Sequence, residues 1–247
     1  MRIIFITDNY PPESNAPASR TYEHVREWIK DKEISVTIIT CCPNFPKGKV
    51  FPGYKNNLIN ISTSGDIKVI RVWSYISKNK GKYRRIIDYL SFSIMASLIG
   101  IFLRPDIIVA TSPQFFTTFT AFFISKLKNV PWIFEVRDLW PYSIESLNVI
   151  KNKFILNLLE KIELYLYKES HQIICLTNSF KKNLINRGVL SSKIDVVTNG
   201  VDLNLFNKKN TKNIKLLPEL KEKFVVGFIG THGISHGLEF IIQSIPY

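Results

Sequence analysis

The sequence predicts an α/β fold built on a doubly wound, mostly parallel sheet, and two observations support this prediction. Segments typical of strands alternate with segments typical of helices along most of the chain, which indicates βαβ units. Several strands are apolar on both faces, as expected where helices cover both sides of a parallel sheet. Such sheets bind ligands outside the carboxyl ends of their strands. The loops that begin at Asp8, Thr111, Arg137 and Thr177 are therefore expected to form a site.

The individual elements follow from hydrophobic periodicity. Short β-branched runs leave no room for a helix and predict strands at residues 2–7, 34–40, 68–72, 106–110, 132–136, 172–176 and 194–197. Apolar residues at helical spacing, such as Tyr22, Val25 and Trp28, predict helices at residues 16–30, 83–103, 115–127, 154–167 and 179–186. Prolines and glycines between residues 41 and 60 predict a long loop.

The last forty residues predict a second, incomplete domain. Residues 207–223 are rich in lysine and asparagine and are interpreted as a linker. Residues 224–230 are expected to form a new strand with a glycine-rich end, and a helix is expected to begin near His236. We therefore divide the chain into a domain at residues 1–206, the linker, and a truncated first βα unit of a second domain at residues 224–247.

The composition is that of a globular protein with an excess of basic residues. The chain has 45% apolar and 21% charged residues and a formal net charge of +13. An anionic partner would explain this charge, and so would a generally basic surface in a chain rich in lysine and asparagine. No nucleic-acid-binding signature occurs, and aromatic residues do not interleave with the basic clusters. A nucleic-acid partner is therefore not expected.

The cysteines and the apolar runs indicate a cytoplasmic protein. Cys41, Cys42 and Cys175 form no CxxC pair and are interpreted as reduced core thiols. The N-terminal apolar run is too short for a secretion signal. The uncharged run at residues 89–103 has 15 residues, whereas a membrane-spanning helix needs roughly 20. A second run at residues 107–125 is broken by Thr-Ser-Pro-Gln, so no transmembrane helix is expected.

Three segments, taken together, resemble the family-4 glycosyltransferases of GT-B fold, in particular those that build bacterial surface polysaccharides. The first is residues 6–13 (Ile-Thr-Asp-Asn-Tyr-Pro-Pro-Glu) with Arg20. The second is residues 135–141 (Glu-Val-Arg-Asp-Leu-Trp-Pro). The third is residues 194–202 (Ile-Asp-Val-Val-Thr-Asn-Gly-Val-Asp), followed by residues 227–233 (Gly-Phe-Ile-Gly-Thr-His-Gly). Each motif is weak alone, but their order and spacing run essentially from end to end.

The resemblance implies two Rossmann-like domains that face each other across a cleft. The N-terminal domain would take a glycan acceptor, in many members lipid-linked, and the C-terminal domain a nucleotide-diphospho-sugar. The resemblance also implies transfer of a hexosyl or acetamidosugar unit, retention of anomeric configuration and no obligatory metal or cofactor. The sequence contains no Asp-x-Asp motif for a diphosphate-bound metal, which agrees with the last point. Further diphosphate-binding and donor-sugar residues would lie beyond residue 247, so little or no turnover is expected from this chain alone.

The candidate catalytic residues follow the fifth parallel strand. Asp138 could orient or deprotonate the acceptor hydroxyl, and Arg137 could bind a phosphate. The alternative is an Arg–Asp pair that only fixes the loop. The acceptor-side cleft is expected to include Glu13, Asn15, Arg20, Thr111 and Ser112. Alternatively, Ser14 or Asn15 caps the next helix in a loop fixed by prolines.

Two further groups complete the predicted site. Gly230, Thr231, Gly233 and His236 flank a strand-to-helix turn of the kind that holds a diphosphate, although a tight βα turn has the same signature. Asn199, Gly200 and Asp202 are interpreted as the crossover between domains, a largely structural role. His24 and His171 have no partner motif and are interpreted as ordinary surface residues.

A basic cluster with Lys78, Lys80, Lys82, Arg84 and Arg85 precedes an apolar helix. This pattern could dock on the anionic inner face of the cytoplasmic membrane, and the alternative is a core helix behind a solvated basic loop. Two rival functions remain to be distinguished. A dinucleotide-binding oxidoreductase should show Gly-x-Gly-x-x-Gly after the first strand, and none occurs there. A non-catalytic remnant that only binds acceptor, membrane or a partner would share the same motifs.

Overall fold

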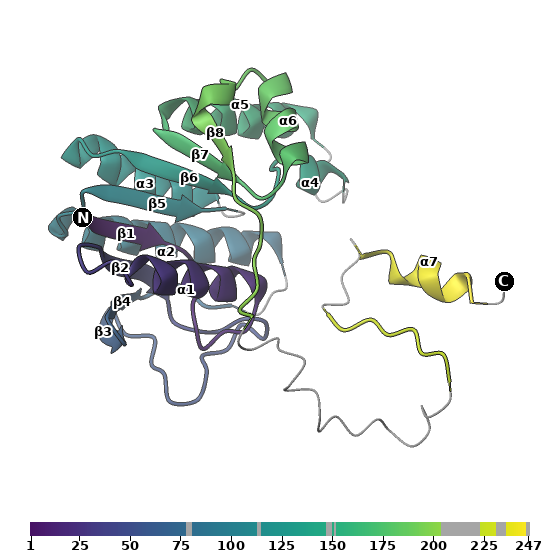
Figure 1. The fold of residues 1–247 in the computed structure, drawn as a ribbon, viewed down its shortest axis with the longest axis horizontal. Helices are drawn as coiled ribbons and strands as arrows, with labels where there is room; N and C mark the ends of the chain where they lie inside the picture. The colour runs from purple at the N-terminus through teal and green to yellow at the C-terminus, as the bar shows by residue number, and fades with distance from the viewer. Residues whose placement is uncertain are drawn as a thin grey trace.

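An eight-stranded sheet forms the centre of the protein, in the order β3-β4-β2-β1-β5-β6-β7-β8 (Figure 1). The computed structural model describes residues 1–77, 81–112, 115–146, 150, 152–203, 223–230 and 236–245. The strands are β1 (Arg2–Ile6), β2 (Ser35–Cys41), β3 (Ile59–Ser64), β4 (Ile67–Val72), β5 (Ile107–Thr111), β6 (Trp132–Val136), β7 (Gln172–Cys175) and β8 (Ile194–Val196). Only the β3–β4 pair is antiparallel, and the other neighbours are parallel.

The helices that pack on the sheet cover its two faces unequally. All helices of the described residues are α1 (Ala16–Trp28), α2 (Lys82–Phe102), α3 (Phe115–Lys128), α4 (Tyr142–Ser146), α5 (Lys153–Glu169), α6 (Asn178–Asn186), the 3-10 turn η1 (Ser191–Lys193) and α7 (Leu238–Gln243). The chain runs from β1 to β2 in one direction across the sheet, and from β4 through β5, β6 and β7 to β8 in the other. Because parallel crossovers are right-handed, the two directions place their helices on opposite faces.

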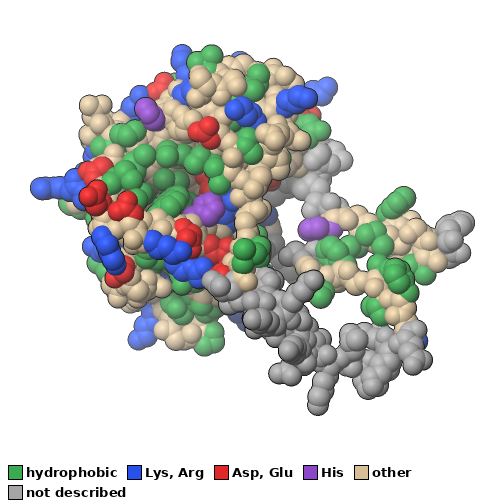
Figure 2. Space-filling model, viewed as in Figure 1, with side chains coloured by type: hydrophobic (Ala, Val, Ile, Leu, Met, Phe, Trp, Pro, Cys, Tyr) green, Lys and Arg blue, Asp and Glu red, His purple; other side chains and the backbone are tan. Residues whose placement is uncertain are grey.

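Two apolar cores lie on opposite faces of the sheet, as the helices do. One contains Phe92 of α2, Ile124 of α3 and Leu166 of α5, packed on one face of the sheet. The other contains Val25 of α1, packed with Phe5 and other strand residues on the opposite face. Figure 2 views the face that carries α1, where hydrophobic side chains gather over the strands beside this helix and basic and acidic side chains intermix elsewhere.

The structure confirms the α/β fold and the mostly parallel sheet, with one correction to the predicted elements. Part of the predicted loop, together with the residues after it, forms the edge strand β3, which turns at Gly65 (φ 60°) into the antiparallel strand β4. The sequence Ile-Asn-Ile-Ser-Thr-Ser is largely exposed, so its hydrophobic signal is weak. Its strand conformation depends on pairing with β4, which is a tertiary interaction.

The C-terminal segment differs from the prediction in a second way. Residues 224–230 are exposed and irregular rather than a strand, because a strand needs a neighbour with which to pair. The expected helix is present as α7, which begins after Gly237 (φ 59°) and buries no residue. The predicted linker lies outside the described residues except Lys223, and the predicted boundary near residues 204–207 lies wholly outside them.

Helix α2 is longer than the uncharged run at residues 89–103 of the sequence. It has 21 residues, and its Tyr83–Phe102 part is long and apolar enough to cross a membrane by length and composition. Only 22% of the most apolar window is buried, which is little for the core helix of a globular domain. Its packing against α3 is close at Gly100, where an added Cβ would lie 2.2 Å from Ile124 Cδ1.

Candidate functional site

The candidate site lies where β1, β5 and β6 end side by side. β1 pairs with β2 on one side and with β5 on the other, and the two crossover directions diverge between them. Ligands bind at this point in open parallel sheets because the flanking loops separate there. Asp8 follows β1, Ser112 follows β5 and Arg137 follows β6, so three of the four predicted loops meet at this edge.

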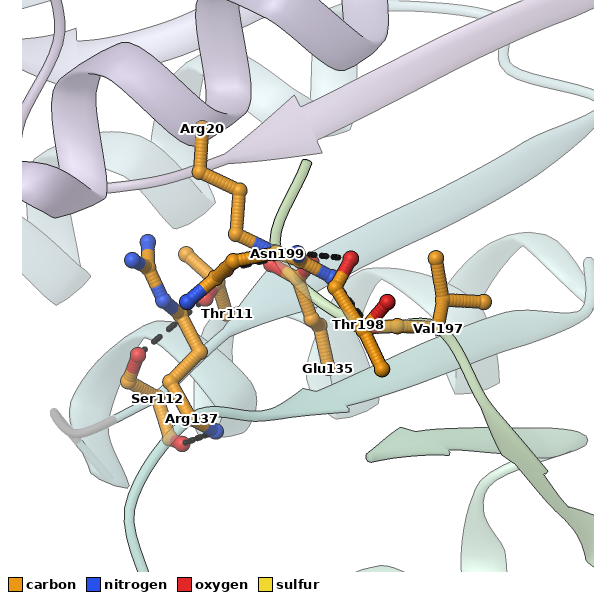
Figure 3. Close-up of polar contacts among 8 residues, drawn as sticks. All are labelled: Arg20, Thr111, Ser112, Glu135, Arg137, Val197, Thr198 and Asn199. Atoms are coloured by element: carbon orange, nitrogen blue, oxygen red, sulfur yellow. Dashed lines mark hydrogen bonds and ion pairs between the residues drawn. The ribbon is translucent and has the colours of Figure 1, made fainter. Parts of the chain in front are cut away.

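A buried ion pair between Arg20 and Glu135 forms the centre of the site (Figure 3). Arg20 Nε donates to Glu135 Oε1 at 2.8 Å, and both side chains are 4% exposed. Arg20 comes from α1 and Glu135 from the end of β6, so the pair joins a helix to a strand 115 residues later. A buried ion pair of this kind requires close geometry to offset the cost of removing both charges from water.

The remaining donors of Arg20 hold the segment after β8. Its Nη2 donates to the carbonyl of Val197 at 3.1 Å, and its Nη1 donates to the carbonyl of Thr198 at 3.3 Å and to Asn199 Oδ1 at 2.9 Å (Figure 3). Two turns further along α1, Arg26 Nη2 donates to Asp202 Oδ2 at 2.6 Å.

The predicted crossover residues are therefore tied to α1. Asn199 and Asp202 each accept a hydrogen bond from an arginine of that helix. Gly200 lies between them, with open space where a side chain would stand.

Thr111 and Ser112 connect the ends of β5 and β6. The Ser112 N–H donates to the Glu135 carbonyl at 2.9 Å, and Ser112 Oγ accepts from the Arg137 N–H at 2.9 Å. Thr111 is buried, and its hydroxyl donates to the Ser112 carbonyl at 3.1 Å. The Ser112 hydroxyl thus holds the backbone at Arg137, and the Thr111 hydroxyl holds the backbone of Ser112 itself, so both have a positioning role.

Arg137 brings a second guanidinium to the site. Burial lowers the pKa of this guanidinium, the nearby charge of Arg20 acts in the same direction, and the charges of Glu135 and Asp8 oppose it. A guanidinium remains charged at neutral pH even so. Its Nη1 is buried and, in the part of the chain that the structure describes, has no hydrogen-bond partner; the same holds for Glu135 Oε2. Among the described residues, the site therefore presents an unsatisfied donor on Arg137 and an unsatisfied acceptor on Glu135.

His24 also belongs to this cluster, although the sequence offered no motif for it. It lies one turn after Arg20 on α1 and is half-buried, not an ordinary surface residue. Burial lowers its pKa, and so do the charges of Arg20 and Arg137, against the opposing effects of Glu135 and Glu23. The imidazole is therefore neutral at pH 7. Its i, i+4 spacing from Arg20 is the signal that could have found it.

Asp88 is a further acidic residue that sequence reasoning missed. It lies on the second turn of α2, and burial raises its pKa to about 6, assisted by the charge of Asp8 and opposed by Ser74 and Arg85. Asp8 and Asp88 are 80 positions apart in the sequence, so no local pattern could have predicted their proximity. A carboxyl group with a pKa this close to neutrality can exchange a proton with a hydroxyl.

Glu13 and Asn15 have partners of their own. Glu13 is 4% exposed, and its Oε1 accepts from the N–H groups of Asn44 and Phe45 at 2.8 and 2.7 Å. Burial raises its pKa, and these hydrogen bonds oppose the change. Asn15 is the N-cap of α1, with its side-chain oxygen accepting from the Ala18 N–H at 2.9 Å. The capping alternative for Asn15 is thus confirmed, and Glu13 holds the loop after β2.

Asp138, the second predicted catalytic residue, lies beside a small cavity. It is half-buried and lines a cavity of about 10 Å³ with Ser112, Phe115 and Trp140, among others. The space is too small for a sugar. A role of Asp138 in orienting an acceptor stays a prediction.

The predicted diphosphate loop is described only in part. Gly230 and His236 lie in exposed segments, and the His236 ring meets Phe228 edge-on at 5.8 Å. Thr231 and Gly233 lie outside the described residues, as do Lys78 and Lys80 of the basic cluster. Within the described ranges, no group of three or more His, Cys, Asp or Glu side chains is arranged to hold a metal ion.

Comparisons with known proteins show the family and the fold of the chain. A family model described as Glycosyltransferase Family 4 matches residues 18–205. The fold is similar to sucrose-phosphate synthase from Thermosynechococcus elongatus (TM-score 0.57, 12% identity), covering 83% of this chain and 49% of that one. It is also similar to Anabaena Alr3699/HepE in complex with UDP-glucose (TM-score 0.50, 10% identity), covering 83% and 46%. The chain thus spans about half the length of these structures. No curated protein matches the sequence.

Proposed function

Because the chain belongs to glycosyltransferase family 4, we propose that it provides the acceptor-side domain of an enzyme that transfers a sugar from a nucleotide-diphospho-sugar to a glycan acceptor. The observation that carries this proposal is the buried Nη1 of Arg137 at the carboxyl ends of β1, β5 and β6, which has no hydrogen-bond partner among the described residues. A guanidinium in this position can bind a phosphate oxygen of the donor or of a phosphate-linked acceptor. The UDP-glucose in the Anabaena structure supports a nucleotide-sugar donor.

The chemistry proposed at this edge needs one bond broken and one formed. The bond between the anomeric carbon and the diphosphate oxygen breaks, and the acceptor hydroxyl oxygen bonds to the same carbon with retention of configuration. The hydroxyl proton passes to the departing diphosphate. Arg137 stabilises charge that develops on phosphate oxygens. Asp8, Asp88 and neutral His24 supply acceptors for hydroxyl groups near the reacting carbon.

No metal or cofactor is part of the proposed reaction. The carboxylates of Glu135 and Asp8 offset the charges of Arg20 and Arg137, so the groups proposed to hold the diphosphate are the Nη1 donor of Arg137 and backbone N–H groups with their partial positive charge. The absence of an Asp-x-Asp motif from the sequence supports the proposal that these groups, rather than a metal, balance the diphosphate.

The exposed side of α2 supports a lipid-linked acceptor. Its large apolar side chains at helical spacing form a stripe, which we call the α2 stripe: Tyr83, Ile87, Leu90, Ile94, Leu98 and Phe102. These side chains are between 41% and 83% exposed. Phe123 and Leu127 of α3, also exposed, lie on the helix packed beside α2. Exposed apolar surface of this extent marks an interaction site.

The charge at the start of α2 supports an anionic membrane surface as the proposed occupant. Arg84 and Arg85 are exposed at the first turn, next to the first residue of the α2 stripe. An apolar stripe flanked by arginines lies in the membrane interface with its charges at anionic headgroups. We therefore place the protein in the cytoplasm, peripheral to the inner face of the membrane. Assembly of a surface polysaccharide such as lipopolysaccharide or capsule is the pathway that fits.

Charge reversal in Arg84→Glu/Arg85→Glu is expected to weaken binding to phosphatidylglycerol-containing vesicles by about tenfold or more, because each basic residue near an anionic surface contributes about 1 kcal/mol. Co-sedimentation measures this. The matched control, Lys30→Glu/Lys32→Glu, changes equal charge next to α1 on the opposite face of the sheet and should leave binding nearly unchanged. Binding that is equally strong for Arg84→Glu/Arg85→Glu would remove the membrane from the proposal.

Two measurements on the 247-residue chain test the transferase proposal. Titration with a polyprenyl-diphospho-sugar should show micromolar binding, and a failure to bind rejects the acceptor-side assignment. Incubation of the chain with this acceptor and a panel of nucleotide sugars should give no transfer, because we propose that a second Rossmann-like domain must hold the donor. A new glycoside detected by mass spectrometry would show that this chain alone can transfer a sugar. That result would contradict the proposal that a second domain must hold the donor.

A further inference from the structure

A polar groove lies at the edge of the sheet away from the Arg20–Glu135 pair. Its volume is about 540 Å³, which is within the range of small-molecule binding sites. One wall is the loop at Tyr10–Pro12, the other is the loop at residues 53–57, and the floor comes from β3 and β4. Nothing in the proposed transfer reaction uses this groove.

The register of β3 and β4 explains why the floor is polar. Asn60, Ser62 and Ser64 alternate along β3 and so share one face of the strand. Asn60 lies opposite Arg71 of β4, and Ser62 opposite Val69. The floor of the groove therefore contains an amide, two hydroxyl groups and a guanidinium. These groups lie on the same face of the sheet as α1, which covers that face nearer the centre of the sheet.

Arg71 joins all parts of the groove. Its Nη1 donates to Ser62 Oγ at 3.0 Å and its Nη2 to the Pro11 carbonyl at 2.8 Å. Its guanidinium also stacks over the Tyr54 ring, 5.3 Å from the ring centre. The side chain is 8% exposed, and no carboxylate among the described residues forms an ion pair with it. A nearly buried cation is therefore held at the groove without a balancing charge.

The hydroxyl of Tyr10 is a second buried polar group beside the groove. Tyr10 lines the groove and is 3% exposed, yet its hydroxyl has no hydrogen-bond partner in the part of the chain that the structure describes. Burying a hydroxyl without a partner costs about 1–3 kcal/mol, so such groups are rare unless a ligand or water completes them.

The lining identifies the class of ligand. Tyr54 is 37% exposed and can stack on a sugar ring, while Asn57, Asn60 and the serine hydroxyls can bond sugar hydroxyls. Lys55 joins Arg71, and no acidic residue lines the groove. We propose that the groove binds a saccharide that carries a carboxylate or phosphate group.

The groove and the candidate site share the loop after β1, because Pro11 and Pro12 line the groove and Asp8 lies three positions before Pro11. The groove would hold acceptor sugars beyond the one that reacts. The proposed ligand rests on the proposed function in one respect only, namely that the saccharide is part of a glycan acceptor.

Isothermal titration of the chain with a tetragalacturonate, compared with maltotetraose as a neutral tetrasaccharide, tests the proposal. The acidic saccharide should bind more tightly, by about fivefold. Tyr54→Ala should weaken binding of the acidic saccharide by about fivefold, and Lys55→Gln should reduce the preference for it, because Arg71 remains. Both residues are exposed, so these variants should keep the native circular dichroism spectrum. Tyr165→Ala and Lys182→Gln, exposed elsewhere, are the matched controls and should bind as the unmodified chain does.

Three outcomes would overturn the proposal. These are equal binding of the two saccharides, binding that neither Tyr54→Ala nor Lys55→Gln alters, and displacement of the saccharide by an equal concentration of inorganic phosphate. The last would show a site for anions alone. Because binding is the readout, a lack of sugar transfer by the chain leaves this test unaffected.

Discussion

Replacing Arg20 with leucine is expected to lower the free energy of unfolding by about 3–5 kcal/mol, because the Glu135 carboxylate would stay buried without its partner. Both side chains of this pair are 4% exposed, so water cannot take the place of the guanidinium without rearrangement of the site. The change also removes three hydrogen bonds to residues 197–199. Urea unfolding followed by circular dichroism measures the difference.

Two further variants separate the ion pair from a simple loss of packing. Arg20→Leu/Glu135→Leu removes both charges and should recover part of the stability lost in Arg20→Leu, since two apolar side chains can replace a buried pair. Arg2→Ala breaks an ion pair with Asp106 that is largely exposed to solvent, so its effect should be far smaller. A double variant less stable than Arg20→Leu would show that charge burial is not the cause.

Arg137→Met should weaken binding of a polyprenyl-diphospho-sugar by about 10- to 100-fold, the contribution of one or two charge-assisted hydrogen bonds. Nη1 of Arg137 is buried and available in the part of the chain that the structure describes, whereas each donor nitrogen of Arg20 is already used. A short-chain prenyl analogue allows the dissociation constant to be measured by titration without membranes.

The stability of Arg137→Met distinguishes a binding residue from a structural one. Burial disfavours the guanidinium charge in the folded state, as the lowered pKa shows, so its removal should leave stability unchanged or raise it. Arg104→Met, an exposed substitution, is the matched control for binding. A large loss of stability in Arg137→Met, or unchanged affinity for the diphosphate, would assign Arg137 to the structure alone.

The loops at the site were predictable, but the partners within it were not. Asp8, Ser112 and Arg137 follow strands that are recognisable from their β-branched runs, and parallel strands place their carboxyl ends at one edge. The pairing of Arg20 with Glu135, and the approach of Asp88 to Asp8, depend on strand order. Strand order is not encoded in local periodicity. The same limit applies to Glu13, whose partners in the loop after β2 lie 31 and 32 positions away, whereas the helix cap at Asn15 is a local contact that the sequence could indicate.

What the sequence determined by itself is most of the elements, though not β3 or α4, and the family resemblance. Apolar runs and helical spacing act between near neighbours in the chain, so they are readable before folding, and the ordered motifs between residues 6 and 202 suffice for the resemblance. The tertiary structure alone decided which charges are buried together, where β3 pairs, and that Tyr10, Tyr54 and Arg71 line one groove. These features arise from contacts between distant residues, whose free energy exists only once the sheet has assembled.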